Sequence, residues 1–146
     1  MKRLPTRAKP ILFTLLLLVI AGCDDKAYVT VYDKTIRKKP IDCLRLKVFP
    51  PDPVAEEAIR GLYPFRDDCP YTLELSTKSG IRCTSNANVP QKVTSNFPSA
   101  YLRMELRRGM RLLYSYYIDL THKPERGDIE RGFRRLGDDL KITPAK

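Results

Sequence analysis

The sequence predicts an α+β domain: a small antiparallel β-sheet of about five to six strands with a C-terminal amphipathic helix packed on it. Apolar and polar residues alternate in several short runs, which is the pattern of half-buried strands. Near the end of the chain, the apolar spacing changes to that of a helix. The chain has 146 residues, and the part that follows a predicted signal peptide is long enough for one core only.

The first 22 residues have the order of an export signal. Four basic residues precede an uncharged apolar run at residues 11–20, and the small residues Ala21 and Gly22 follow it. The run is too short for a signal anchor that stays in the membrane, because a spanning helix needs about 20 residues. We therefore expect cleavage after Gly22, with residues 27–146 forming one periplasmic domain.

The segment Ile20-Ala21-Gly22-Cys23 resembles the lipobox of bacterial lipoproteins. The resemblance implies that Cys23 becomes the first mature residue and carries a thioether-linked diacylglycerol and an N-acyl chain. Two or three acyl chains hold a protein firmly on a membrane, whereas one anchors it only reversibly. The alternative is an ordinary cleaved signal peptide that happens to precede a cysteine.

Asp24 and Asp25 follow the predicted lipidation site. The pair resembles the retention signal of enterobacterial-type lipoproteins, which implies a location on the periplasmic face of the inner membrane. Alternatively, the two acids only solvate a tether. In either case, residues 23–26 are expected to form the lipidated N-terminus and tether, which place the domain close to the bilayer.

The first half of the domain is expected to contain two strands and one segment that is either a helix or a loop. Residues 27–36 alternate as a strand, and residues 43–49 form another that ends at a proline-rich stretch. Asp52 is placed as an N-cap, Pro53 as the first helical residue and Gly61 near the C-terminal end. This stretch is either a helix of two turns or a loop.

A third strand is predicted at residues 71–76, with a turn at Lys78-Ser79-Gly80 that leads back through residues 81–83. Residues 85–98 lack periodicity and are rich in Asn, Ser and Pro, so they are expected to form a loop. Loops of that length are uncommon unless they are functional.

Residues 99–119 predict a β-hairpin, because two alternating runs flank Arg107-Arg108-Gly109. A two-residue turn at Arg108-Gly109 would pair polar with apolar residues, so we expect a three-residue loop that ends in Gly109. This register pairs Leu106 with Met110, Met104 with Leu112, and Glu105 with Arg111.

The C-terminal helix is predicted from Ile129, Phe133, Leu136 and Leu140, which are spaced by four, three and four residues. This spacing puts all four on one helix face. Gly132 and Gly137 weaken the helix by about 1 kcal/mol each relative to Ala, so it must be held by packing on the sheet.

Three cysteines remain once Cys23 is lipidated, and they lie in an oxidising compartment. Alternation places Cys43 on the outer face of its strand and Cys83 with the apolar Ile81, whereas Cys69 lies in a loop. We predict a Cys43–Cys69 disulfide and a buried, reduced Cys83. No pair has the spacing of a redox or zinc motif.

Composition and motifs argue against an enzyme and against a nucleic-acid-binding protein. His122 is the only histidine, so neither a Ser-His-Asp triad nor a histidine metal site can be assembled. Asp67 and Asp68 lack the further oxygen ligands of a calcium loop. We expect no metal and no cofactor other than the lipid on Cys23.

The chain without its signal peptide has 23 basic and 17 acidic residues, which gives a net charge of +6. A modest positive charge favours anionic lipid headgroups or an acidic protein partner, although an ordinary solvated surface is the alternative. No nucleic-acid-binding motif accompanies the basic residues.

The hairpin predicts a candidate surface for a protein partner, because Arg and Tyr dominate interface hot spots. Its members are expected on the face opposite Leu102, Met104 and Leu106: Tyr101, Arg103, Arg107, Arg111 and Tyr117. A polar strand face that is simply solvated is the alternative.

The layout of residues 20–25, the strand around Cys43 and the Cys69-Pro70 segment resembles small lipoproteins that serve as immunity proteins of type VI secretion systems. The resemblance implies a periplasmic antitoxin that binds an effector toxin. Members of that family end on a strand, whereas this chain adds a C-terminal helix. The alternatives are an accessory lipoprotein of a secretion or envelope machine, and an inner-membrane lipoprotein without a dedicated ligand.

Overall fold

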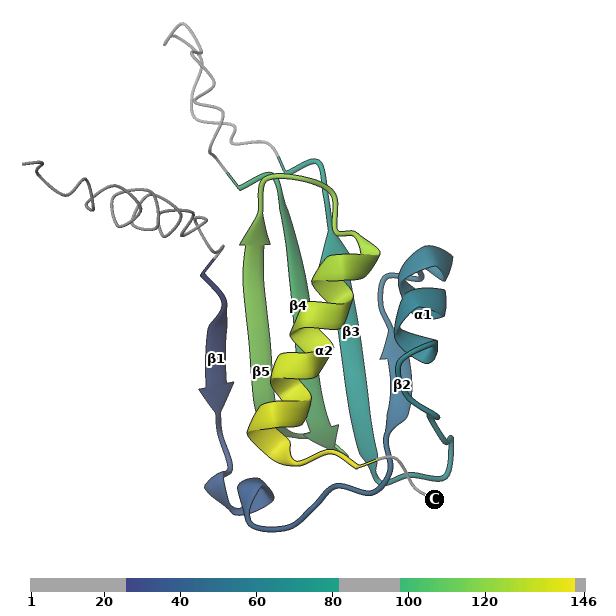
Figure 1. Cartoon of the computed structure of the whole chain (residues 1–146), viewed down its shortest axis with the longest axis vertical. Coiled ribbons are helices and arrows are strands. Elements are labelled where there is room, and N and C mark those ends of the chain that lie inside the picture. The colour runs from purple at the N-terminus through teal and green to yellow at the C-terminus, as the bar shows by residue number, and fades with distance from the viewer. Residues whose placement is uncertain (1–25, 82–97, 144–146) are drawn as a thin grey trace, which may run out of the picture.

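The computed structural model describes residues 26–81 and 98–143, and Figure 1 shows one sheet with helices beside it. Five strands form a sheet in the order β1-β5-β4-β3-β2. The elements in chain order are β1 (Tyr28–Val31), η1 (Lys34–Arg37), β2 (Arg45–Val48), α1 (Pro53–Arg60), β3 (Tyr71–Lys78), β4 (Ala100–Arg108), β5 (Arg111–Leu120) and α2 (Arg126–Leu140). The predicted α+β class, with a C-terminal helix packed on the sheet, is confirmed.

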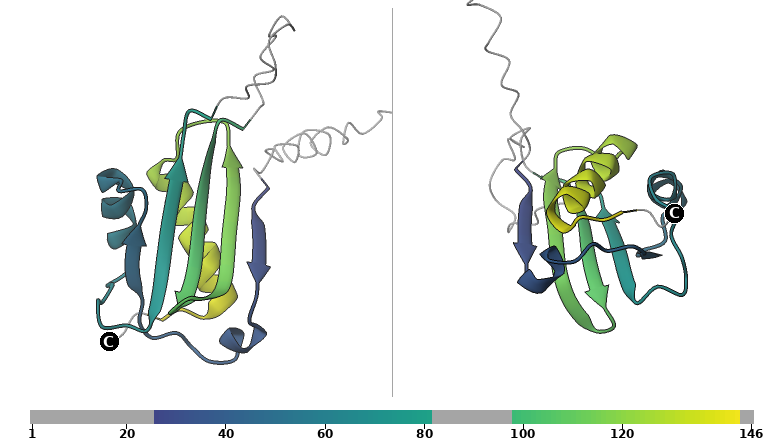
Figure 2. Two further views of the ribbon diagram at one scale, coloured as in Figure 1. Left: turned by 180° about the vertical axis from the view of Figure 1, so that it is seen from behind. Right: turned by 60° about the horizontal axis from the view of Figure 1, so that its bottom comes forward.

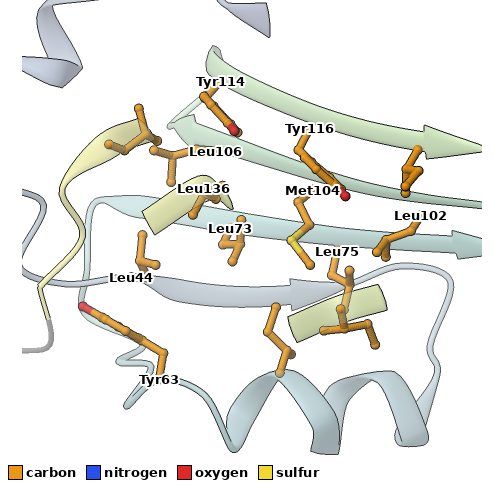
Figure 3. Packing of buried hydrophobic residues seen from close by; sticks show 14 of the residues in the cluster. Leu44, Tyr63, Leu73, Leu75, Leu102, Met104, Leu106, Tyr114, Tyr116 and Leu136 are labelled. Atoms are coloured by element: carbon orange, nitrogen blue, oxygen red, sulfur yellow. The ribbon is translucent and has the colours of Figure 1, made fainter. Parts of the chain in front are cut away.

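The core lies between the helices and one face of the sheet (Figure 3). Leu102, Met104 and Leu106 of β4 are fully buried at its centre. The residues of β3 and β5 that pair with these three lie on the same face of the sheet, because paired residues of adjacent strands share a face. These partners are Leu73, Leu75 and Thr77 on β3 and Tyr114, Tyr116 and Ile118 on β5.

Helix α2 packs on this face through its predicted apolar residues. Ile129, Leu136 and Leu140 are buried, and Phe133 is partly buried against the core. Gly132 is buried in the contact with the sheet. At the first turn, Glu125 and Asp128 form a reciprocal capping box, which satisfies backbone N–H groups that have no partner within the helix.

The stretch after Asp52 is a helix, which settles the two alternatives for this segment. The Asp52 carboxylate accepts a hydrogen bond from the backbone N–H of Ala55 (3.1 Å), Pro53 opens α1, and Gly61 is its C-cap. Because α1 carries the chain back across the sheet, β2 and β3 run parallel. The sheet is therefore mostly antiparallel, with one parallel pair at its β2 edge.

Two predicted strand boundaries were wrong. The first strand ends at Val31, because the Asp33 carboxylate accepts a hydrogen bond from the N–H of Thr35 (2.9 Å) and caps η1. Strand β3 continues to Lys78, beyond its predicted end at residue 76, and pairs with β2 and β4. Residues 82–97 lie outside the described part of the chain, and with them Cys83 and nearly all of the predicted loop at residues 85–98.

The hairpin was predicted correctly, but its register was wrong. The turn consists of Gly109 and Met110, with Gly109 at a φ of +58° that favours glycine. Leu106 pairs with Tyr114, because β5 has a bulge that places the extra residue Leu113 in the strand. The carbonyl of Leu113 accepts hydrogen bonds from the N–H groups of Tyr32 (2.9 Å) and Asp33 (3.3 Å), which joins the bulge to the end of β1.

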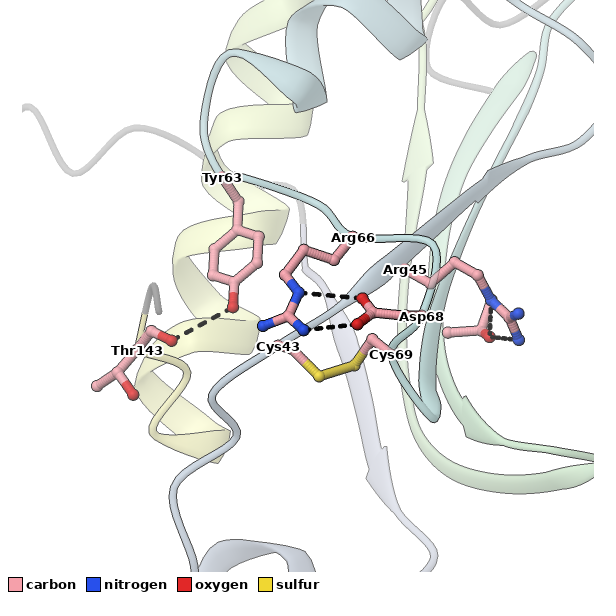
Figure 4. The surroundings of a disulfide bond; sticks show 8 residues. Cys43, Arg45, Tyr63, Arg66, Asp68, Cys69 and Thr143 are labelled. Carbon is pink, nitrogen blue, oxygen red and sulfur yellow. Dashed lines mark hydrogen bonds and ion pairs between the residues drawn. A yellow bond between two sulfur atoms is a disulfide. The ribbon is translucent and has the colours of Figure 1, made fainter. Parts of the chain in front are cut away.

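The predicted Cys43–Cys69 disulfide is present, with 5.8 Å between the two Cα atoms (Figure 4). It connects the segment before β2 with the segment before β3, so it closes the β2-α1-β3 unit. Arg66 and Asp68 form a bidentate ion pair next to it (3.0 and 2.7 Å).

No helix in the described part of the chain is long and apolar enough to cross a membrane.

Candidate protein-binding face

The sheet has a second face, and within the described residues no helix covers it (Figure 2). We call this surface the outer face. It consists of the residues that alternate with the buried ones on all five strands, and its central members are Tyr28, Arg45, Lys47, Glu74, Tyr101, Arg103, Glu105, Arg107 and Tyr117. Four of the five residues predicted for a partner-binding surface lie here: Tyr101, Arg103, Arg107 and Tyr117.

Tyr101 and Tyr117 form an aromatic pair on the outer face, with 5.6 Å between their ring centroids. The Tyr117 hydroxyl donates a hydrogen bond to the Asp119 carboxylate (2.7 Å). This hydrogen bond, together with burial, raises the pKa of Tyr117 to about 12. The Tyr117 ring is therefore held in place and uncharged at neutral pH.

Glu105 is the centre of a charged cluster on the same face. It is only 8% exposed, and Arg107 Nη2 lies 2.6 Å from its Oε2 while Arg103 Nε lies 3.6 Å from its Oε1. Opposite it on β3 stands Glu74, which forms an ion pair with Lys47 (3.5 Å). Facing carboxylates repel each other, so these cations offset the repulsion while their own charged groups are fixed on the sheet.

The charges of the outer face differ in their exposure. The side chains of Lys47 and Arg103 are 59% and 41% exposed, whereas those of Glu74 and Glu105 are 18% and 10% exposed. The acids lie beneath the cations that pair with them. An approaching molecule therefore meets positive charge first.

A shallow depression of about 530 Å³ lies at one end of the outer face. Its polar border includes Arg45, Lys47 and Arg107, and its other end is formed by Gly109 and Met110 of the hairpin turn. Arg45 donates two hydrogen bonds to the Thr72 hydroxyl (3.2 and 3.0 Å). The pairing of β2 with β3 brings Arg45 and Lys47 beside Arg107 of β4.

Arg111 does not belong to the outer face, although it was predicted there. The bulge in β5 changes the alternation, so Arg111 pairs with Arg108 and Glu105 pairs with Ser115. Arg111 instead forms an ion pair with Asp33 (3.1 Å). The predicted Glu105–Arg111 pair was therefore wrong.

His122 takes part in a polar cluster at the start of α2. Its Nε2 lies 3.1 Å from Oδ2 of Asp128, which is 3% exposed and also pairs with Arg131. The same Asp128 oxygen accepts a hydrogen bond from the N–H of Glu125 (2.8 Å). The cluster stabilises the helix start, and in residues 26–81 and 98–143 no three His, Cys, Asp or Glu side chains gather as a metal site.

The predicted lipidation site Cys23 and the sorting residues Asp24 and Asp25 lie outside the described residues. Comparison with protein-family models, with curated proteins and with solved structures finds no match for this chain.

Proposed function

We propose that this protein is a lipoprotein, anchored through Cys23 to the periplasmic face of the inner membrane, whose domain binds an acidic protein partner through the outer face. The observation that carries the proposal is the uncovered sheet surface on which the side chains of Arg103 and Lys47 are much more exposed than the acids that they pair with. Charge complementarity favours a partner with exposed carboxylates. The Cys43–Cys69 disulfide supports an oxidising compartment.

The proposed partner is an effector toxin that enters the same compartment, which makes this chain an immunity protein. A pair of tyrosines beside arginines held by ion pairs suits this role, because Tyr and Arg are enriched in interface hot spots and Tyr supplies contact area at a low cost in side-chain entropy. The second candidate is an accessory subunit of a secretion or envelope machine, which the same surface would serve. The neighbouring genes distinguish the two, since a toxin gene favours immunity and a secretion operon favours the accessory role.

Metabolic labelling with a fatty acid tests the anchor. The unmodified chain should incorporate the label, and Cys23→Ser should lose both the label and membrane retention. Labelled Cys23→Ser protein would contradict lipidation at this residue.

Membrane fractionation in an enterobacterial host tests the sorting signal. The unmodified chain should fractionate with the inner membrane, and Asp24→Ser should shift part of it to the outer membrane. Outer-membrane fractionation of the unmodified chain would refute the sorting signal.

Where a toxin gene adjoins the gene of this chain, binding is tested with the full-length chain and the purified toxin. Arg103→Ala and Tyr117→Ala should each weaken binding by about 2 kcal/mol or more, as is typical of hot-spot truncations. The matched surface control is Arg134→Ala, on the exposed side of α2, which should leave binding unchanged. Met104→Ala shows the effect of a core change, because it should lower the free energy of unfolding by roughly 2 to 5 kcal/mol. Unchanged binding by both outer-face variants, or equal loss of binding and thermal stability, would exclude the outer face.

Survival of cells that produce the toxin separates immunity from the accessory role. Cells with the unmodified chain should survive, and cells with Arg103→Ala or Tyr117→Ala at equal protein levels should not. Binding without protection would favour the accessory role.

A further inference from the structure

A second surface of the domain adjoins the outer face at Tyr28 and lies along the edge of the sheet (Figure 1). Strand β1 pairs with β5 on one side only, and η1 continues from its end. We call this surface the basic edge. It consists of exposed side chains from β1, η1 and their flanks: Lys26, Tyr28, Tyr32, Lys34, Arg37, Lys38 and Lys39.

Most of the net charge of the domain is concentrated in this segment. Residues 26–39 contain five basic residues and one acidic residue, Asp33, whereas the rest of the chain after Gly22 contains 18 basic and 16 acidic residues. Of the net charge of +6, the basic edge therefore supplies +4. The five cations are all exposed, so their field reaches the surroundings.

The one acid of the segment is occupied by local contacts. Asp33 accepts hydrogen bonds from the N–H (2.9 Å) and the hydroxyl (2.6 Å) of Thr35, and it forms an ion pair with Arg111 (3.1 Å). Arg111 is itself 71% exposed. With Arg108, Lys38 and Lys39 it borders a depression of about 390 Å³ at the end of the basic edge, so the positive surface continues around η1.

Two tyrosines accompany the cations. Tyr28 and Tyr32 are 59% and 57% exposed, which is unusual for large aromatic side chains. The backbone of Tyr32 is fixed by its hydrogen bond to the Leu113 carbonyl (2.9 Å). Exposed tyrosines among lysines and arginines are typical of surfaces that contact the interface of a lipid bilayer.

We propose that the basic edge rests on an anionic lipid surface and so orients the domain on the membrane. Tyr28 lies five residues after Cys23, a reach of at most about 18 Å, so the proposed lipid anchor holds this edge near the bilayer. Lysines that are separate and fully hydrated suit the diffuse negative charge of lipid headgroups. This inference relies on the proposed anchor for proximity only, and it leaves the outer face accessible beside the membrane.

The test measures amide hydrogen exchange of the full-length chain reconstituted into vesicles of phosphatidylcholine, with or without phosphatidylglycerol. Exchange in residues 26–39 should be slower by about threefold or more in the vesicles that contain phosphatidylglycerol, and high salt should remove the difference. Lys38→Glu with Lys39→Glu should abolish it. The matched control, Lys123→Glu with Arg134→Glu, reverses two exposed cations elsewhere and should leave the protection unchanged.

Equal exchange in both kinds of vesicle would overturn the proposal. It would also be overturned if residues 26–39 were protected only after addition of an acidic protein, because the basic edge would then belong to a protein interface. Flotation of the chain with both kinds of vesicle, measured first, establishes that the chain is membrane-associated before exchange is compared. Fatty-acid labelling tests the anchor separately.

Discussion

A Cβ atom at Gly132 of α2 would lie 2.9 Å from Cε1 of Tyr116 on β5. The same atom would lie 3.2 Å from Cε of Met104 on β4. The missing side chain therefore determines how closely the helix approaches the sheet. Any larger residue must push the Tyr116 ring or the helix away from a closely packed core.

Gly132→Ala should destabilise the domain, although alanine is the better helix former. The gain in helix propensity is about 1 kcal/mol, whereas overpacking a core typically costs about 1 to 3 kcal/mol. Urea denaturation should show a lower free energy of unfolding. Gly137→Ala is the matched control, because a Cβ there would meet no atom within 4 Å, and it should stabilise the domain. Equal gains at both positions would contradict the close contact.

Tyr114→Phe should weaken the junction between β5 and α2. The Tyr114 hydroxyl donates a hydrogen bond to the Asp139 carboxylate (2.9 Å), and the tyrosine is fully buried. A hydrogen bond to a charged group contributes about 1.5 to 3 kcal/mol, and the Arg135–Asp139 ion pair (3.1 Å) compensates for part of the loss. Thermal unfolding should shift to lower temperature; an unchanged melting temperature would show that the hydroxyl contributes nothing.

Alkaline pH should destabilise the fold through Tyr117. Its pKa is raised to about 12 in the folded chain, against about 10 for an unfolded tyrosine. The protonated side chain is favoured by folding, so its contribution is complete below pH 10 and is lost as the pH rises toward 12. The absorbance titration curve of Tyr117→Phe is subtracted from that of the wild-type chain. The difference should show one ionisation near pH 12. An ionisation near pH 10 would exclude the Asp119 hydrogen bond.

Removal of the disulfide should lower the free energy of unfolding by about 3.5 kcal/mol, as the chain-entropy model gives for a loop of this size. The two cysteines are separated by 26 residues. Chemical denaturation of a Cys43→Ala and Cys69→Ala double variant measures the loss.

Alkylation tests the oxidation state of the three cysteines. In the wild-type mature chain, denatured without a reductant, the reagent should modify Cys83 alone. Three modified cysteines would contradict the disulfide and the oxidising compartment.

Alternation of apolar and polar residues was sufficient to predict β3, β4 and β5, because each has one buried and one uncovered face. It could not predict that β2 runs parallel to β3. The direction of β2 depends on α1, whose eight residues were equally compatible with a loop. Two successive apolar residues, Leu112 and Leu113, conceal the bulge in β5, since either could face the core.

The candidate surface was predictable for residues within regular alternation and not beyond it. Arg103 and Tyr117 lie where the period of two places them, whereas Arg111 lies past the bulge and faces the other way. The role of Lys47 depends on the β2–β3 register, which the sequence does not specify. The +4 charge of the basic edge is present in the sequence, but the exposure of its tyrosines required the strand order.

The single-sided cover of the sheet has a consequence for how this protein can change over evolutionary time. Along β4, the buried residues that fold the domain and the residues of the proposed binding surface alternate position by position, so the two sets are encoded by interleaved codons. Substitutions at Tyr101, Arg103 or Arg107 can alter recognition while Leu102, Met104 and Leu106 still specify the same core. Such a sheet can change its uncovered surface, one alternate residue at a time, without loss of its fold.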